Sequence, residues 1–444
     1  MTKQAGRDGL VRTDLRSGIA YVIMARPPEN RLDAEMLQAL TAACKMYLAD
    51  AATRVLVISA EGENFSLGTG VDLAPAAGLQ GLVSCLESAH IPVVAALCGY
   101  VRGPAVALAM AAHYRIATAD AVLTLPESAV GLLPACGTVQ RICRMADIST
   151  VLDLCLYGRR LTAEAAAQAG LIDGIVDGEL LAGIGAFARE LLARRMGPRP
   201  AGVRALVPES MGRGLQFLAQ AKARLGETRL LAPNRILDTV EAAYLLPYEA
   251  GLRFEAQAAE DAQRDPAGRG LRHLAAAERN LPLTLLAANP DGRSGLSAEG
   301  MEIAGSFRAA WILAARALLQ TGVREEVIDA AALAYGYAVG PFATAAQAQP
   351  KAGLAERLGD ALLAEAARLM EGGRLSSAAD CDALAALATG FPRWRGGPLH
   401  AAEVGGLMQR LRAMEGWEAL DPVWQAPDLL RAAAARGHWP RKPV

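Results

Sequence analysis

No charge of one sign dominates this sequence. Its 444 residues include 45 Lys and Arg against 46 Asp and Glu, so the formal net charge at pH 7 is −1. A protein that binds nucleic acid through its overall charge carries a clear basic excess. The balance therefore excludes nucleic acid as a bulk electrostatic partner and leaves only local basic patches for a phosphorylated ligand.

Cysteine and histidine are scarce and irregularly spaced. The seven cysteines are an odd number, and no CxxC occurs. This pattern favours neither a disulfide framework nor a structural zinc site, and it indicates a reducing, cytoplasmic location. The five histidines show no HxxxH-type spacing, so we expect no metal site.

Long hydrophobic runs are also lacking. The longest apolar stretch, residues 91–112, is interrupted by Arg102, Gly103 and Pro104, which makes it unsuitable as a membrane span. The N-terminal sequence MTKQAGRDG has no apolar signal core. Hydrophobic residues nevertheless reach 52%, which is typical of a globular protein, and the length predicts two to four domains.

Strand and helix patterns alternate in the first part of the chain. Strands are predicted at residues 19–24, 54–59, 92–96, 115–117 and 121–124. Asp33 can cap a helix that runs through Met36, Leu40 and Tyr47. This alternation predicts an α/β layer domain with crossover helices. After about residue 185 the strand signals fade and helical patterns follow, with residues 288–295 as the best candidate linker.

In the last third of the chain, one sequence pattern occurs twice. The order helix, Gly stop, Asp, helix and Gly-Pro turn occurs at residues 317–342 and again at residues 368–399. Asp329 and Asp382 occupy corresponding places in the two copies. The pattern predicts a duplicated helical unit; the alternative is chance similarity in a chain rich in Ala, Leu and Gly.

Four ordered stretches then resemble the signatures of the crotonase superfamily, the enoyl-CoA hydratases and isomerases. They are FSLGTGVDL at residues 65–73, GYVRGPAVALA at 99–109, LPE…GLLP at 125–134, and GRRLT…AGLID at 158–173. The first carries one extra residue relative to the family pattern. The resemblance implies a spiral of ββα repeats that holds an acyl-coenzyme A thioester.

The C-terminal part resembles the type-one multifunctional β-oxidation enzymes. The stretch GFPRWRGGPLH at residues 390–400 is close to their GFPRWRGGPM motif, and LRHLAAAER at 271–279 is similar to the end of their linking helix. We therefore expect an α/β crotonase domain at 1–190, a helical extension with the linking helix at 191–285, and two similar all-α repeats at 296–444.

The nucleotide-binding domain of those enzymes has no counterpart here. About 20 residues separate the linking helix from the next helix near Ile303, and no GxGxxG follows a strand. Hydride transfer is therefore not expected, and we expect neither NAD nor another cofactor.

The resemblance implies one catalytic carboxylate. Family hydratases use two glutamates, one in GGGxE and one in PE. The first position is Ala107 in this chain, and the second is retained as Glu127. Because alanine cannot transfer a proton, two-carboxylate hydration is not expected. The pattern is similar to that of enoyl-CoA isomerases, in which a single glutamate moves a proton between carbons.

The resemblance also places an oxyanion hole. Two backbone N–H groups of the family polarise the thioester oxygen. One is expected at Gly68 or Thr69. The other aligns with Pro104, which has no N–H, so that Ala105 would have to supply a shifted donor.

Ligand binding is implied for other residues. The pantetheine would pass Leu67, and Arg26 and Arg31 are candidates for the adenosine phosphates. Cys136 lies beside the expected acyl pocket, as a packing residue or a nucleophile, and His113 is expected to be structural.

Two further hypotheses for the function remain. One is a catalytically degenerate scaffold that binds acyl-CoA or a partner such as a thiolase or another β-oxidation enzyme. The other is a different crotonase chemistry, such as thioester hydrolysis or C–C bond cleavage.

Overall fold

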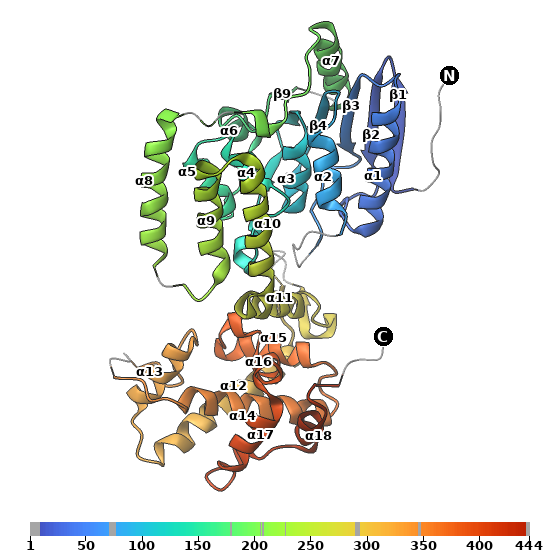
Figure 1. Ribbon diagram of the computed structural model, residues 1–444. Coiled ribbons are helices and arrows are strands. Elements are labelled where there is room, and N and C mark those ends of the chain that lie inside the picture. Colours follow the sequence, from blue (N-terminus) through green and yellow to red (C-terminus); the bar gives the residue numbers. More distant parts are fainter. Residues whose placement is uncertain are drawn as a thin grey trace. The chain divides into compact units, whose positions relative to one another are not determined.

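The computed structural model describes residues 9–70, 77–177, 180–204, 206, 208–226, 228–288, 294–344 and 348–440. The chain divides into two compact units, Met1–Gly268 (unit 1) and Arg269–Val444 (unit 2), which Figure 1 colours from blue to olive and from yellow to red. The boundary falls inside the segment 191–285, for which the sequence predicts a helical extension.

A mixed sheet forms the centre of unit 1. Within the described residues its order is β1-β2-β3-β4-β6-β9. The strands are β1 (Val11–Arg16), β2 (Ile19–Met24), β3 (Val55–Ala60), β4 (Val93–Leu97), β6 (Tyr114–Thr118) and β9 (Gly174–Val176). β1 and β2 pair antiparallel, whereas the other neighbours pair parallel. Parallel pairs need crossover connections, so the predicted α/β architecture is confirmed.

Helices cover both faces of this sheet. In Figure 1, α1, α2 and α3 lie side by side along one face. On β3, Leu56 and Ile58 belong to the core beneath these helices, whereas Val55 and Val57 pack with α7 on the opposite face. This period-two alternation is what a strand buried on both sides requires. The helices of unit 1 are α1 (Ala34–Ala49), α2 (Leu79–Glu87), α3 (Pro104–Ala111), α4 (Thr138–Cys143), α5 (Ile148–Cys155), α6 (Ala163–Gln168), α7 (Leu180–Ala193), α8 (Pro208–Leu225), α9 (Leu231–Leu245), α10 (Tyr248–Arg264), and the 3-10 turns η1 (Pro126–Val130) and η2 (Ala201–Val203).

A smaller sheet carries the segments of interest for function. It consists, among the described residues, of β5 (Tyr100–Arg102), β7 (Val122–Thr124) and β8 (Leu161–Thr162). β5 and β7 run parallel, and β8 pairs antiparallel with β7. Ser66 adds a single parallel bridge to Val101. Three chain segments therefore run in the same direction side by side.

Asp33 caps α1 as the sequence predicts. Its carboxylate accepts a hydrogen bond from the N–H of Met36 at 3.0 Å and forms an ion pair with Arg26 at 2.7 Å. Replacing Asp33 with alanine is expected to lower the free energy of unfolding of unit 1 by about 1 kcal/mol. Urea denaturation measures this loss, and Glu35→Ala, exposed in the same first turn, is the control. Equal losses in the two variants would contradict the capping role.

Unit 2 is rich in helices. The boundary between the units lies within α11 (Pro266–Arg279). The further elements are η3 (Leu283–Leu285), β10 (Leu286–Ala288), β11 (Ser294–Leu296), α12 (Ala298–Leu319), α13 (Glu325–Tyr335), α14 (Leu354–Glu371), α15 (Ala378–Thr389), η4 (Arg393–Arg395), α16 (Pro398–Gly405), α17 (Leu407–Glu415), η5 (Pro422–Trp424) and α18 (Asp428–Arg436).

Two expectations for this region need correction. β10 and β11 pair antiparallel, so the C-terminal region is not entirely helical. The segment 288–295 was expected to link domains, but its flanks form this hairpin within unit 2, and residues 289–293 lie outside the described residues. The three-residue strands are too short and too poor in β-branched side chains to give a sequence signal.

The same contact occurs twice in unit 2. Asp329 on α13 accepts a hydrogen bond from the N–H of Phe342 at 3.0 Å, and Asp382 on α15 accepts one from the N–H of Leu399 at 2.7 Å. In both places the aspartate lies against the glycine of a Gly-Pro pair. A side chain at Gly340 would place its Cβ 2.3 Å from the Asp329 Cγ, a distance that forbids any side chain there.

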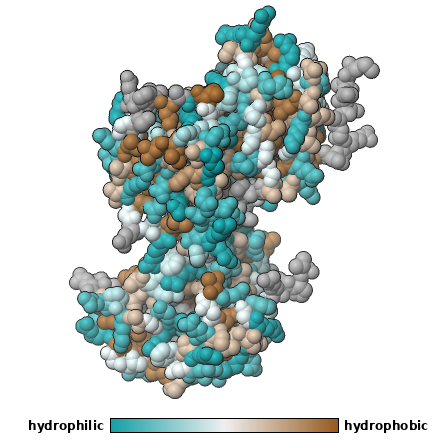
Figure 2. Space-filling view, in the orientation of Figure 1, coloured by the Kyte–Doolittle hydropathy of each residue, from teal (hydrophilic) through white to brown (hydrophobic). Residues whose placement is uncertain are grey.

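Hydrophobic and hydrophilic residues are interspersed on the face of the molecule that Figure 2 shows. In the part of the chain that the structure describes, none of the helices combines the length and the apolar character that crossing a membrane would require.

Candidate functional site

The predicted site residues follow the carboxyl ends of the three parallel segments. Gly68 and Thr69 follow Ser66, Pro104 and Ala105 follow β5, and Glu127 follows β7. The carboxyl ends of parallel strands meet at one edge of a sheet, where ligands of α/β proteins commonly bind. A hydrogen bond of 2.9 Å from the N–H of Gly103 to the carbonyl of Thr124 fixes the last two segments to each other.

Gly68 is in direct contact with the segment that contains Pro104. A side chain at Gly68 would place its Cβ 2.7 Å from the Arg102 carbonyl oxygen and 3.1 Å from the Pro104 Cδ. The backbone of Gly68 also has φ +77°, which L side chains rarely adopt. Glycine is therefore required here, and the two arms of the expected oxyanion hole lie against each other.

Of the expected oxyanion donors, the N–H of Gly68 is engaged and Pro104 has none, and the N–H of the neighbouring Leu67 is engaged as well. The N–H of Leu67 donates to the Glu29 carbonyl at 2.9 Å, and that of Gly68 donates to the Ser66 hydroxyl at 3.1 Å. Pro104 has no N–H. Ala105 is the second residue of α3, where an N–H has no acceptor within its own helix.

Thr69 brings a side-chain group to the same loop. Its hydroxyl oxygen is buried and has no hydrogen-bond partner among the described residues. A buried hydroxyl without a partner is costly in a folded protein and commonly marks the place of a ligand or water.

Glu127 is a buried carboxyl group in η1. The residue is only 2% exposed, and its Oε2 has no hydrogen-bond partner within the described part of the chain. Burial raises the pKa of Glu127 to about 8, because it disfavours the charged form. A hydrogen bond from its own backbone N–H and the positive charge of Arg102 act in the opposite direction. A carboxyl group with a pKa near neutrality suits general acid–base catalysis.

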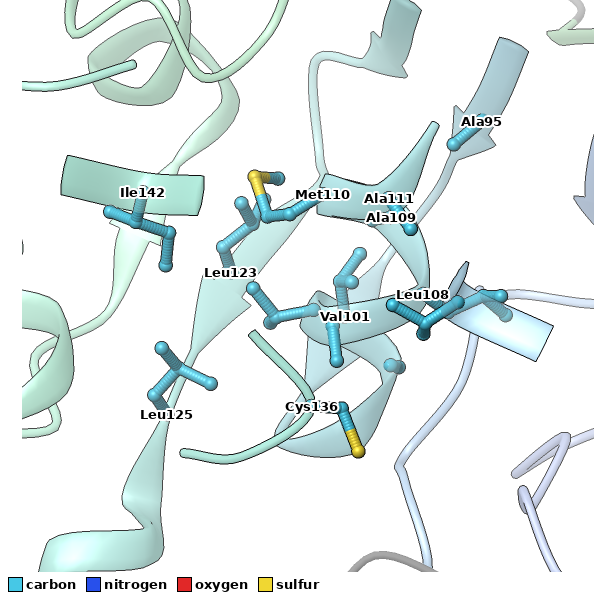
Figure 3. Close-up of a cluster of buried hydrophobic side chains, with 14 of the residues drawn as sticks. Ala95, Val101, Leu108, Ala109, Met110, Ala111, Leu123, Leu125, Cys136 and Ile142 are labelled. Carbon is cyan, nitrogen blue, oxygen red and sulfur yellow. The ribbon is translucent and has the colours of Figure 1, made fainter. Parts of the chain in front are cut away.

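An apolar cluster accounts for this burial. Figure 3 shows Val101, Leu123 and Leu125 together with Met110 of α3 and Cys136. All five are buried in the core of unit 1. Leu125 precedes Glu127 by two residues, so η1 directly follows a segment that is part of this cluster.

Three other residues named from the sequence supply no second carboxylate. Ala107 lies in α3 and is 1% exposed, so its methyl group occupies the first family position without a carboxylate. Burial raises the pKa of the Cys136 thiol to about 12, which keeps it protonated. His113 is fully buried and its ring nitrogens contact the N–H of Val93 and the carbonyl of Glu87, both at 3.1 Å.

The candidate ligand-binding residues lie beside the same loop. Arg26 is paired with Asp33, and Arg31 with Glu29, so both arginines already have acidic partners. The N–H of Leu32 donates to the Gly68 carbonyl at 3.0 Å. The structure thus brings the arginine-bearing loop and the loop of Leu67 and Gly68 together.

Sequence reasoning missed two residues of this region. Arg102 ends β5, and its Nη1 lies 3.5 Å from the Gly70 carbonyl oxygen. Its signal was a single charge inside an otherwise apolar stretch. Asn30 is completely buried, and its Nδ2 donates to the carbonyls of Glu61 and Asn64 at 2.9 Å. No local pattern predicts these two contacts, because both acceptors lie more than 30 positions away.

No cluster of His, Cys, Asp and Glu that could hold a metal ion occurs in the residues that the structure describes. Asp173, which ends the last signature stretch, is held to β6 by polar contacts. The N–H of Arg115 donates to an oxygen of Asp173 at 2.8 Å, and the guanidinium of Arg115 is completely buried. Residues 71–73, which complete the first signature, lie outside the described residues.

Comparison with known proteins gives the following. Residues 14–233 match the family described as enoyl-CoA hydratase/isomerase. Similar solved structures include an enoyl-CoA hydratase from Shewanella pealeana, with 23% identity over 49% of this chain and 89% of that chain and a TM-score of 0.39. DspI of Pseudomonas aeruginosa has 24% identity over 50% of this chain and 97% of that chain, with a TM-score of 0.40. An enoyl-CoA hydratase from Thermoplasma volcanium has 23% identity over 59% of this chain and 94% of that chain, with a TM-score of 0.39. Residues 14–233, which contain the candidate site, therefore belong to the enoyl-CoA hydratase/isomerase family of the crotonase superfamily.

Proposed function

We propose that unit 1 binds an acyl-CoA thioester and that Glu127 moves a proton between carbon atoms of its acyl chain. The reaction would be the isomerisation of a double bond or the protonation of an enolate. The observation that carries this proposal is a buried carboxyl group at the shared edge of three parallel segments, whose Oε2 has no hydrogen-bond partner among the residues that the structure describes.

The chemistry requires only one carboxylate. In isomerisation, ionised Glu127 takes a proton from the α-carbon of a 3-enoyl thioester, and the electron pair of that C–H bond moves into an enolate. The protonated carboxyl group then returns the proton to the γ-carbon, and a 2-enoyl thioester results. Ala107 cannot hold a water molecule for attack as a second carboxylate would, which disfavours hydration.

A catalytically degenerate scaffold is the second candidate. The absence of an N–H at Pro104 and the engagement of the Leu67 N–H favour it, because one lost oxyanion donor costs about 10²- to 10³-fold in rate. In this reading the protein binds acyl-CoA, a thiolase or another β-oxidation enzyme without turning over substrate.

We further propose that residues 296–444 contain two similar helical units. The repeated contact of Asp329 and Asp382 with a Gly-Pro turn supports this proposal beyond the repeated sequence pattern. A cytoplasmic location in acyl-CoA breakdown, without NAD or another cofactor, completes the proposed function and follows from the sequence pattern alone.

A panel of 2-enoyl-, 3-enoyl- and 3-hydroxyacyl-CoA esters, analysed by mass spectrometry, tests the proposal. We expect the wild type to convert a 3-enoyl ester, with kcat/KM rising with pH up to about 8, because the base must be ionised. Glu127→Gln is expected to lower kcat by at least about 10²-fold.

Glu255→Gln is the matched control. Glu255 is also completely buried with a pKa raised to about 7, but it lies on α10, where it accepts a hydrogen bond from the N–H of Gln140. Its replacement should leave turnover within a few-fold of the wild type. Tight binding of acyl-CoA without any turnover, unchanged in Glu127→Gln, would contradict catalysis and leave the scaffold.

A further inference from the structure

The proposed reaction places negative charge on the thioester oxygen when the enolate forms. Family members stabilise this charge with two backbone N–H groups, but here the N–H groups of Leu67 and Gly68 are bonded elsewhere and Pro104 has none. An enolate without a strong donor would be too high in energy for efficient proton transfer. The N–H of Ala105 remains as one donor at the start of α3, and a second donor would have to come from another group at the same edge of the sheet.

Arg102 is placed at this edge by the strand that carries Pro104. It is the last residue of β5, pairs in register with Thr124 of β7, and is half-buried. Its Nη1 reaches the Gly70 carbonyl oxygen at 3.5 Å, so the guanidinium lies along the loop that holds Gly68 and Thr69. The positive charge of Arg102 also lowers the pKa of Glu127, against the larger effect of burial.

Thr69 supplies a second donor on the same loop. Its hydroxyl is buried and has no hydrogen-bond partner among the described residues. A hydroxyl can rotate its hydrogen toward a ligand oxygen, which a backbone N–H cannot do. The Arg102 side chain therefore contacts the loop that carries the buried Thr69 hydroxyl, and together they offer a cation and a rotatable donor.

We propose that the Arg102 guanidinium and the Thr69 hydroxyl form a side-chain oxyanion site that binds the thioester oxygen of an acyl-CoA substrate. The inference rests on the proposed function. As the α-C–H bond breaks, the proton goes to the Glu127 carboxylate and the electron pair forms the enolate C=C bond. The charge that reaches the oxygen pairs with Arg102. When the proton returns to carbon, the C=O bond is restored and the ion pair is dissolved.

Acetoacetyl-CoA tests this site by binding alone, because its enolate absorbs in the near ultraviolet. Bound to the wild type, it is expected to ionise at a lower pH than in free solution. Arg102→Gln should reduce the enolate-to-keto ratio at fixed pH by about 10²- to 10³-fold, the usual cost of an oxyanion donor. Thr69→Val, which preserves the side-chain shape, should reduce it about 10-fold, as expected for a neutral donor.

Two further variants separate charge from structure. Arg102→Lys retains a cation and should preserve part of the enolate band. Pro104→Gly restores a backbone N–H, so it should recover the band at least 10-fold when it is added to Arg102→Gln. Arg12→Gln removes an exposed arginine of β1 that pairs with Glu61 at 2.8 Å, and it should titrate as the wild type does.

The possible outcomes are distinct. If acetoacetyl-CoA does not bind to the wild type, both the proposed function and this inference are overturned. If it binds and the Arg102→Gln and Thr69→Val variants titrate as the wild type does, only the side-chain oxyanion site is overturned. A selective loss in both variants, with recovery through Pro104→Gly, supports it.

Discussion

Glu127→Gln is expected to stabilise unit 1 increasingly as the pH rises from 5 to 9. The folded state holds the Glu127 proton up to a pKa of about 8, whereas the unfolded chain releases it near the ordinary value of 4.5. Wild-type stability from this group is therefore complete below pH 4.5 and is lost as pH rises through 8. Glutamine does not titrate, so the difference in unfolding free energy should grow by about 4 kcal/mol across this range.

The composition of the two units allows this change to be measured in unit 1 alone. All five tryptophans lie in unit 2, and all cysteines except Cys381 lie in unit 1. Labelling of the buried thiols in urea therefore reports unfolding of unit 1, and tryptophan fluorescence reports unit 2. The fluorescence transition should be the same in the wild type and the variant. If the thiol-labelling midpoints of both proteins depended on pH in the same way, this would contradict the claim that burial raises the pKa of Glu127.

The proposed activity of Glu127 and the stability of unit 1 are opposed. An uncompensated carboxyl group is retained at a buried position, although glutamine would be more favourable there at neutral pH. Such strain is typical of functional sites, where a group is held in an unfavourable state because the chemistry needs it. The combination of greater stability and lost turnover in one variant would link the buried geometry directly to the proposed reaction.

Sequence predicted the parts of the site that lie in local patterns. Glu127 was identified because residues 125–134 resemble the family's Pro-Glu signature, and Asp33 because it precedes a helical pattern. The occupied N–H of Leu67 could not be predicted, since its acceptor, Glu29, is 38 positions earlier in a separate loop. Arg102 was seen only as an interruption of an apolar stretch. Its role depends on the parallel pairing of β5 with β7, which no local pattern specifies.

In the fold, too, elements with a local sequence signal were predicted and elements without one were not. The buried strands of unit 1 are rich in valine, isoleucine and leucine, and the match between predicted strands and β2, β3 and β4 is close. The hairpin of β10 and β11 escaped prediction because Leu-Ala-Ala and Ser-Gly-Leu carry no strand preference. Tertiary pairing alone makes these residues extended.

Arg410→Met is expected to destabilise unit 2 by about 3–5 kcal/mol at pH 8, because it removes the partner of a buried charge. Arg410 Nε donates to Asp360 Oδ1 at 2.7 Å, and its Nη2 pairs with the second carboxylate oxygen. Asp360 is only 2% exposed. Burial raises its pKa to about 6 even though the Arg410 hydrogen bond and charge lower it. Without Arg410 the carboxylate would be charged, buried and without its cation.

The loss should depend on pH in a defined direction. Removing Arg410 raises the pKa of Asp360 further, so the carboxyl group is protonated at pH 5 and the destabilisation there should be small. It should increase as the pH rises above 6. Tryptophan fluorescence in urea at pH 5 and pH 8 measures the two values, while thiol labelling of unit 1 should not change.

A double variant separates the charge from the packing of the arginine side chain. Asp360→Asn combined with Arg410→Met removes both charges at similar volume, and it should recover most of the stability lost at pH 8. If the double variant were as unstable as Arg410→Met, or if the loss in Arg410→Met were equal at both pH values, the arginine would act through its contacts with neighbouring side chains. Recovery together with a loss confined to high pH would show instead that unit 2 keeps Asp360 ionised only because Arg410 is present.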